Sequence, residues 1–458
     1  MPAKRGKKPP QLKIQDACRT GDIEAVVAEM MANRSIAGMQ VGGCLALAVI
    51  SMRDENEAAI ARAGGVEAVV AGMTAHGTSQ GVQEQGCQAL RALAASDENN
   101  GAIVSPVIVR AGGIEAVVAG MRAHRSIGGV QEKGCSVLAN LSANGENTTV
   151  IEMAGGVEAV VAGMRAHPTI ADVQMQGCWA LSNLARSDEN RRTAIAGAGG
   201  IEVVVAAMVA HRSSEGVQEQ GCLAIRSLSQ NDDFKTAIAR AGGIEAVVAG
   251  MRAHCHEGMG AHCHWLSAGV QVQGCFALRN LALNDENRTA IARAGGIEAV
   301  VVGMGTLTQI AEVQTSGCAA LGNLLSNNDE NRTAIARAGG IEALVAGMGR
   351  HKSISGVQQK GCWALANLAV EAVDKTAIAR AGGIEAVVAG MGAHPAIAGV
   401  QQTGCRALRK LSSDANRTAI AGAGGIAAVV AGMRAHMSIA GVEREGRLAL
   451  KIFKSRSD

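Results

Sequence analysis

Two pairs of side chains with the same spacing are the residues of this sequence best suited to bind a ligand. Trp179 and Asn183 are four residues apart, and so are Trp363 and Asn367. An asparagine amide carries both donors and an acceptor, so it can satisfy the backbone of an extended peptide without requiring a particular sequence. An indole beside the amide offers a flat apolar surface for the peptide's side chains. These two pairs are therefore the first candidates for a binding site.

Asparagine recurs at one position of a repeated segment. The segment is GVQQKGCWALANLA at 356–369, with near-copies that start at Gly81, Asp172, Gly269 and Glu312. The asparagines at this position are Asn140, Asn183, Asn280, Asn323 and Asn367, and Phe276 takes the place of the tryptophan in one copy. Asparagine is a mediocre helix former. Five recurrences therefore favour a function over the alternative that asparagine is merely tolerated at an exposed helical position.

Basic side chains lie on or beside the same face of the repeated segment. They are Arg91, Arg226, Arg279, Arg406, Arg409 and Lys410, whereas Glu84, Glu132 and Glu219 stand toward its other end. Guanidinium groups pair with carboxylates and phosphates through charge-assisted hydrogen bonds. We therefore expect the partner to offer an extended segment that is acidic or phosphorylated.

A second candidate chemistry is metal binding in one insertion. Its possible ligands are His254, Cys255, His256, His262, Cys263 and His264. Such residues bind zinc or copper. However, GMRAHCHE at 250–257 and GMGAHCHW at 258–265 form a tandem duplication. We expect a slipped copy that makes a long loop over 255–265, with no bound metal, and keep a metal-binding module as an alternative.

No constellation of catalytic residues stands out from the repeat. Histidines such as His351 and His394 close the second helix of their units, where they can bond the last carbonyls. The glutamine after each valine, as in Gln358, is expected to satisfy loop backbone between units. Because catalysis needs one asymmetric constellation, we expect no enzyme and no cofactor.

The repeated segment has the pattern of an amphipathic helix. On a helical wheel Leu368 and Leu365 lie about 140° and 200° from Trp363, whereas Asn367 lies about 40° from it. One side is therefore core and the other carries the tryptophan and the asparagine. Gly361 falls on the core side, where glycine costs about 1 kcal/mol relative to alanine. Its presence there predicts the close approach of a neighbouring element.

Each repeat is expected to hold three helices. Nine cysteines, equivalent to Cys362, recur at intervals of 43 to 53 residues, and Gly-Gly pairs follow a similar step. A period of this length indicates a solenoid and exceeds the roughly 33–34 residues of ankyrin and TPR units. A short helix ends at each Gly-Gly corner, as in 285–296, and a second helix and the repeated segment follow. One step holds five extra residues at 104–108, and we expect Pro106 among them to interrupt a first helix.

Composition excludes several classes of partner. The net charge is +3, with Lys4, Arg5, Lys7 and Lys8 near the start, and the chain has only six Phe and Trp residues and no Tyr. Nucleic-acid binding requires basic stripes and stacking rings, so we expect none. No apolar run reaches the length of a membrane span. We expect a monomer in the cytoplasm, the nucleus or both, with its nine repeated cysteines reduced and packed as small apolar residues.

The motif DENRTAIARAGGIEAVVAGM followed by VQxQGCWALxNLA resembles the armadillo repeat, across about ten units from Gln11 to Phe453. One departure is glutamate, as in Glu298, where many armadillo units carry proline. The resemblance implies an all-α fold, a right-handed α-solenoid of about ten three-helix repeats. We expect a basic, disordered tail at 1–10 and a single solenoid over 11–456.

The resemblance also implies a function. In this family the third helices line a concave groove, and importin-α-like members use a Trp-x-x-x-Asn pair there, which Trp179/Asn183 and Trp363/Asn367 match in type and spacing. We therefore expect a scaffold or adaptor that binds an extended segment of a partner protein in this groove. An importin-α-like nuclear transport adaptor is the alternative, although Ser136 and Ala319 interrupt its tryptophan array. The run Lys4–Lys8 is either a nuclear import signal or a solvated tail.

Overall fold

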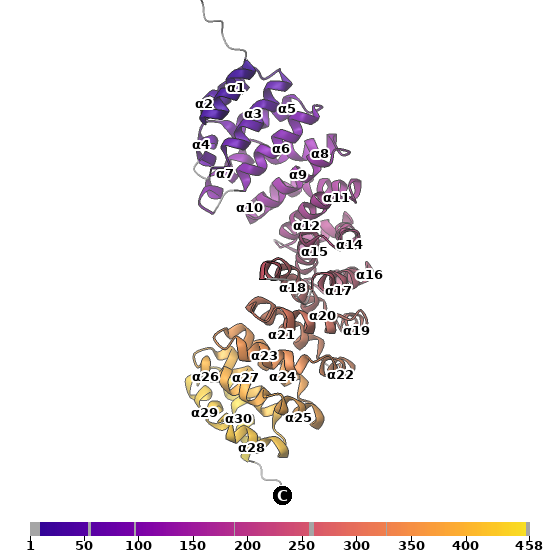
Figure 1. The fold of residues 1–458 in the computed structure, drawn as a ribbon, viewed down its shortest axis with the longest axis vertical. Helices are drawn as coiled ribbons and strands as arrows, with labels where there is room; N and C mark the ends of the chain where they lie inside the picture. The colour runs from indigo at the N-terminus through magenta and orange to yellow at the C-terminus, as the bar shows by residue number, and fades with distance from the viewer. Residues whose placement is uncertain are drawn as a thin grey trace, which may run out of the picture. The chain divides into compact units, whose positions relative to one another are not determined.

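The computed structural model describes residues 10–53, 56–95, 98–186, 188–255, 261–326 and 328–454. Every regular element within these ranges is an α-helix, which confirms the predicted all-α solenoid class (Figure 1). In the same ranges no single helix is long and apolar enough to cross a membrane. Four pairs of helices, each bent at a short break, have the length and composition to do so together.

The helices fall into three kinds, as the repeat predicts. After α1 (Pro10–Thr20), the first helices are α4 (Asn56–Arg62), α7 (Glu98–Arg110), α10 (Gly145–Met153), α13 (Glu189–Gly197), α16 (Asp232–Arg240), α19 (Asp285–Arg293), α22 (Asp329–Arg337), α25 (Ala372–Arg380) and α28 (Asp414–Gly422). The second helices are α2 (Ile23–Ala32), α5 (Gly65–Ala75), α8 (Gly113–Ala123), α11 (Gly156–Ala166), α14 (Gly200–Ala210), α17 (Gly243–Ala253), α20 (Gly296–Thr306), α23 (Gly340–Arg350), α26 (Gly383–Ala393) and α29 (Gly425–Ala435). The third helices are α3 (Ala37–Ile50), α6 (Gln80–Ala94), α9 (Gly128–Ser142), α12 (Ala171–Ala185), α15 (Glu215–Leu228), α18 (Ala261–Leu281), α21 (Ala311–Leu324), α24 (Ser355–Leu368), α27 (Ala398–Leu411) and α30 (Ala440–Lys454).

The chain divides into two compact units, Met1–Leu228 and Ser229–Asp458. In the first unit each third helix packs against the next, from α3 through α6, α9 and α12 to α15, and in the second unit the same holds from α18 through α21, α24 and α27 to α30. Successive second helices also pack against one another, from α2 to α14 in the first unit and from α17 to α29 in the second. The single solenoid expected over 11–456 stays a prediction.

The Gly-Gly corner between the first and second helices requires both of its glycines. Gly339 has a φ of 80°, a left-handed conformation that suits glycine. A Cβ on Gly340 would lie 2.5 Å from Cγ2 and 2.8 Å from the carbonyl oxygen of Ile335. The first glycine therefore makes the turn, and the second lets the two helices meet closely.

The predicted close approach at the third-helix glycine is confirmed. A Cβ on Gly361 would lie 2.5 Å from both Cγ and Sδ of Met348, which is the core methionine of α23. Met348 is 1% exposed. Glycine in the third helix therefore makes room for the buried methionine of the second helix.

The repeated cysteines are small core residues, as expected. None of the nine forms a disulfide and all nine are buried, among them Cys178 and Cys362. Burial raises the pKa of the Cys178 thiol to about 12. Because the thiolate is the reactive form, these cysteines are chemically quiet near neutral pH.

Two local expectations are corrected. Pro106 does not interrupt its helix, because α7 runs unbroken from Glu98 to Arg110. A proline removes one backbone hydrogen bond, and this helix continues on those that remain. In the second insertion α18 begins at Ala261, so the end of the loop expected over 255–265 is helical, and residues 256–260 lie outside the described ranges. The tail at 1–9 is also outside them, whereas Pro10 belongs to α1.

Candidate peptide-binding face

The third helices present one side to their own unit's core and the other outward. Leu365 and Leu368 of α24 are fully buried, whereas Trp363 and Asn367 are half-buried on the opposite side. Trp179 of α12 is likewise half-buried. The indoles therefore lie at the outer face of their helices, on the first unit for Trp179 and on the second for Trp363.

The Trp363 ring lies on the neighbouring third helix. A Cβ on Gly322 of α21 would collide with Cζ3 and Cε3 of this indole. On its own helix, Lys360 places Nζ 6.0 Å from the Trp363 ring centroid, within cation–π range. The absence of a side chain at Gly322 thus creates the place where the indole packs. Sequence reasoning missed this role of Gly322. The one feature that could have indicated it is the presence of glycine at this position of the copy that starts at Glu312.

The asparagine amides bond to the preceding third helix. Asn183 Nδ2 donates to the backbone carbonyl oxygen of Ala139 at 3.0 Å. Asn367 Nδ2 donates to that of Gly322 at 3.1 Å. Asn323 makes the same bond to Arg279 O at 2.7 Å. The longest bond of the set joins Asn140 to Arg91 O, at 3.4 Å. The recurrence of asparagine therefore has a structural cause, a hydrogen bond between successive repeats.

This geometry corrects one assumption about the asparagines. Asn183 and Asn323 are 6% and 8% exposed, so the expected exposed helical position is wrong for these two residues. Asn140, Asn280 and Asn367 are half-buried. Contact of the asparagines with a bound peptide stays a prediction.

Other recurring polar residues also serve the fold. Gln358 Nε2 donates to Met348 O at 2.8 Å and to His351 O at 3.0 Å, which closes the end of α23. His394 Nε2 lies 2.8 Å from Lys352 O of the preceding repeat. The repeated amides and imidazoles hold the solenoid together. Selectivity for a ligand must then come from residues that do not recur.

The non-recurring charges differ between the two units. In the second unit α18, α21, α24 and α27 carry one acidic residue, Glu312, and five basic residues, Arg279, Lys360, Arg406, Arg409 and Lys410. The last third helix, α30, carries four basic and two acidic residues. In the first unit α3 carries no charge, and α6, α9, α12 and α15 together carry five acidic and three basic residues. The second unit therefore offers the more positive third-helix face.

Three cations gather near Trp363. Burial and the neighbouring Arg279 guanidinium lower the pKa of Lys360. Arg406 Nη2 lies 3.5 Å from Asn367 Oδ1. Arg279 also places its guanidinium carbon 5.8 Å from the Phe276 ring centroid. We call Arg279, Lys360, Trp363, Asn367 and Arg406 the Trp363 cluster.

The remaining predicted site residues are distributed over both units. Arg226 is half-buried on α15 of the first unit, and Asn280 is half-buried on α18 of the second. Arg409 is engaged elsewhere, because its Nε lies 2.9 Å from Glu445 Oε2 of α30. The structure thus brings Arg279, Trp363, Asn367 and Arg406, all expected on this face, into one cluster and adds Lys360 to them.

The predicted metal ligands fall mostly outside the described side chains. Of the six, His254 and Cys255 are described, and Cys255 Sγ lies 3.5 Å from Thr306 Oγ1. Among the side chains that the structure describes, no three His, Cys, Asp or Glu residues converge as a metal site requires.

Repeated three-helix units with an outward face of third helices define an α-solenoid repeat protein. A family model described as LRRK2 ARM repeat matches residues 52–292 and 114–456. The chain belongs to the armadillo-repeat family.

Many solved structures resemble this chain, including the following two. The crystal structure of an engineered protein from the Northeast Structural Genomics Consortium is 30% identical, with a TM-score of 0.77 over 95% of this chain and 100% of that one. A structure reported under a title on a phosphorylation switch that controls the interaction between cadherin and β-catenin is 17% identical. Its TM-score is 0.66 over 88% of this chain and 78% of that one, which shows a shared fold. No curated protein sequence matches the chain.

Proposed function

We propose that the protein is a non-enzymatic scaffold whose second unit binds an extended, anionic segment of a partner protein across the Trp363 cluster. The armadillo fold supports a role in protein interaction. The observation that carries the anionic specificity is the cluster itself. Within the described part of the chain, Arg279, Lys360 and Arg406 have no carboxylate within ion-pair distance.

Uncompensated cations held close together favour an anionic ligand. Lys360 loses hydration on burial and is repelled by Arg279, so a bound carboxylate or phosphate would relieve both effects. The indole of Trp363 supplies apolar surface beside these charges. The Asn367 amide, which is half-buried, can contribute a hydrogen bond to the backbone of the segment.

The test is fluorescence anisotropy of the full chain with short labelled peptides. One peptide is rich in glutamate and aspartate, a second carries phosphoserines, a third is neutral and a fourth is rich in lysine. We expect the two anionic peptides to bind, and Lys360→Gln or Arg406→Gln to weaken that binding by about tenfold, because each removes a charge-assisted hydrogen bond.

Lys352→Gln is the matched control, since Lys352 is exposed in the loop after α23 and lies outside the cluster. Its binding should equal that of the wild type. Equal binding by Lys360→Gln, Arg406→Gln and Lys352→Gln would contradict the proposed site.

A nuclear transport adaptor is the second candidate. The supporting observation is the Trp179/Asn183 pair on α12, in a first unit whose third helices carry more acidic than basic residues. This candidate predicts that the lysine-rich peptide binds and that Trp179→Ala abolishes binding. The metal-binding alternative is tested by zinc titration of the chain, with His262→Ala/Cys263→Ala as the comparison.

We also propose that the protein acts as a monomer in the cytoplasm or the nucleus, without nucleic acid or membrane. Support comes from the small net charge of +3 and the six Phe and Trp residues. Size-exclusion chromatography with light scattering tests the oligomeric state.

A further inference from the structure

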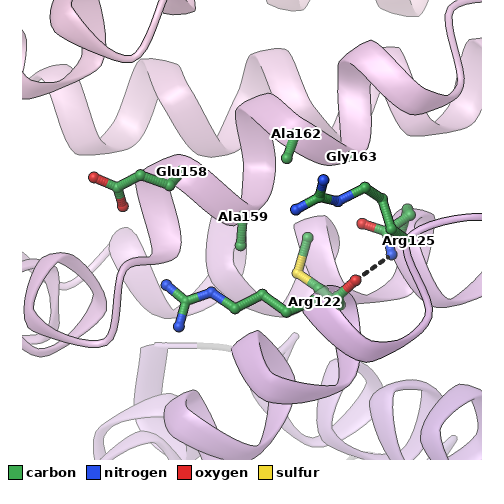
Figure 2. Close-up of a pocket in the computed structure, with 8 residues that line it drawn as sticks. Arg122, Arg125, Glu158, Ala159, Ala162 and Gly163 are labelled. Atoms are coloured by element: carbon green, nitrogen blue, oxygen red, sulfur yellow. Dashed lines mark hydrogen bonds between the residues drawn. The ribbon is translucent and has the colours of Figure 1, made fainter.

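A pocket of about 180 Å³ lies between the second helices α8 and α11 of the first unit. It is separate from the candidate peptide-binding face, which the third helices carry. Figure 2 shows the side chains that line it. In this view the Arg125 side chain extends past Ala162 toward Ala159, the Arg122 side chain lies on the other side of Ala159, and the Glu158 carboxylate points away from Arg125.

The floor of the pocket is small and apolar. It is formed by Ala159 and Ala162 of α11 and by the buried Met121 of α8. Gly163 adds no side chain, and a Cβ there would lie 2.6 Å from Gln131 Oε1. The space fits a few methylene groups and one compact polar group.

Arg122 and Arg125 differ in the hydrogen bonds that their guanidinium groups make. Arg122 Nη2 donates to Gly155 O at 3.2 Å, and in the next repeat Arg165 Nη2 donates to Ala198 O at 3.0 Å, one residue before the corresponding glycine. This bond joins one second helix to the following Gly-Gly corner. The exposed Arg125 guanidinium has no hydrogen-bond or ion-pair partner among the described residues.

Arginine occupies both positions in one repeat only. In the next repeat Arg165 is equivalent to Arg122, but Pro168 stands in the position of Arg125. In the repeat after that Arg212 is equivalent to Arg125, but Val209 stands in the position of Arg122. The presence of arginine at both positions is therefore not a consequence of the repeat, unlike the amides and imidazoles that join successive units.

We propose that this pocket binds a carboxylate on a short aliphatic stem, supplied by an acidic side chain or the C-terminus of a partner protein. The planar fork of a guanidinium matches a carboxylate in two hydrogen bonds. The apolar floor contacts the stem. Glu158 in the lining disfavours a phosphate dianion more than a carboxylate, because repulsion grows with the charge of the ligand.

The experiment is methyl NMR of the full chain labelled at its methionine and alanine methyl groups. Met121, Ala159 and Ala162 report on the pocket during titration at constant ionic strength. The probes are N-acetylglutamate α-amide for an acidic side chain, N-acetylalanine for a C-terminus, and inorganic phosphate. We expect saturable shifts with at least one carboxylate probe, and the tighter of the two identifies the source.

Arg125→Gln should weaken this binding by about tenfold, the effect of one charged hydrogen-bonding group. Because Arg125 makes no side-chain bond within the described structure, the variant should keep the wild-type spectrum elsewhere. Arg165→Gln is the matched control and should bind as the wild type does. Shifts that do not saturate, shifts unchanged in Arg125→Gln, or tighter binding of phosphate than of either carboxylate would each overturn the proposal.

Discussion

At the scale of single residues, the same amide can serve a ligand or a neighbouring helix. Asn183, Asn323 and Asn367 each donate Nδ2 to a backbone carbonyl of the preceding third helix. This bond satisfies a carbonyl oxygen between packed helices, where water has little access. Repetition of a polar residue in a solenoid is therefore weak evidence for a binding function.

Asn323→Ala tests this structural role. The variant removes the 2.7 Å bond to Arg279 O from a side chain that is 8% exposed. We expect a loss of stability of about 1–2 kcal/mol, because the carbonyl is left without its partner. Urea unfolding followed by circular dichroism measures it. An unfolding curve that coincides with the wild type would show that the bond contributes nothing.

At the scale of helices, two glycines of the same helix are expected to affect stability in opposite ways. Gly347 and Gly349 both lie in α23, two residues apart. A Cβ on Gly347 would lie 2.5 Å from Gln314 Oε1, whereas nothing lies within 4 Å of a Cβ on Gly349. Gln314 cannot move freely, because its Nε2 is bonded to Met304 O at 2.8 Å.

The two alanine variants should therefore change stability in opposite directions. Gly349→Ala should raise it by up to about 1 kcal/mol, the difference in helix propensity. Gly347→Ala should lower it, since the new methyl group displaces a buried, hydrogen-bonded glutamine. Thermal unfolding of both variants beside the wild type measures the difference. Stabilisation by both substitutions would contradict the packing described for Gly347.

At the scale of the whole molecule, the distribution of charge separates the two units. The third helices α18, α21, α24 and α27 carry five basic residues and one acidic residue, whereas acidic residues predominate on the third helices of the first unit. The net charge of +3 conceals this difference. The third-helix faces of the two units therefore differ in the sign of their predominant charge.

Binding of an anionic peptide should accordingly weaken with salt. The Debye length falls from about 30 Å at 0.01 M to about 8 Å at 0.15 M, which screens the attraction between the peptide and the basic face. Anisotropy titrations with the glutamate- and aspartate-rich peptide at these two concentrations measure the effect. Affinity that does not change with salt would indicate recognition through the Trp363 indole alone.

Sequence alone determined the repeat, its three helices, the Gly-Gly corners and the core positions, because each follows from local periodicity and backbone conformation. Gly361 could be predicted to allow a close approach, since glycine is unfavourable inside a helix. The partners of the repeated asparagines and of Trp363 could not be predicted in this way. Asn323 bonds to Arg279 O, a residue 44 positions earlier in the chain, and Trp363 packs where Gly322 lacks a side chain. Only the tertiary structure brings such residues together, because it sets which side of one repeat faces the next. It therefore decided which amides join helices and which cations remain for a ligand.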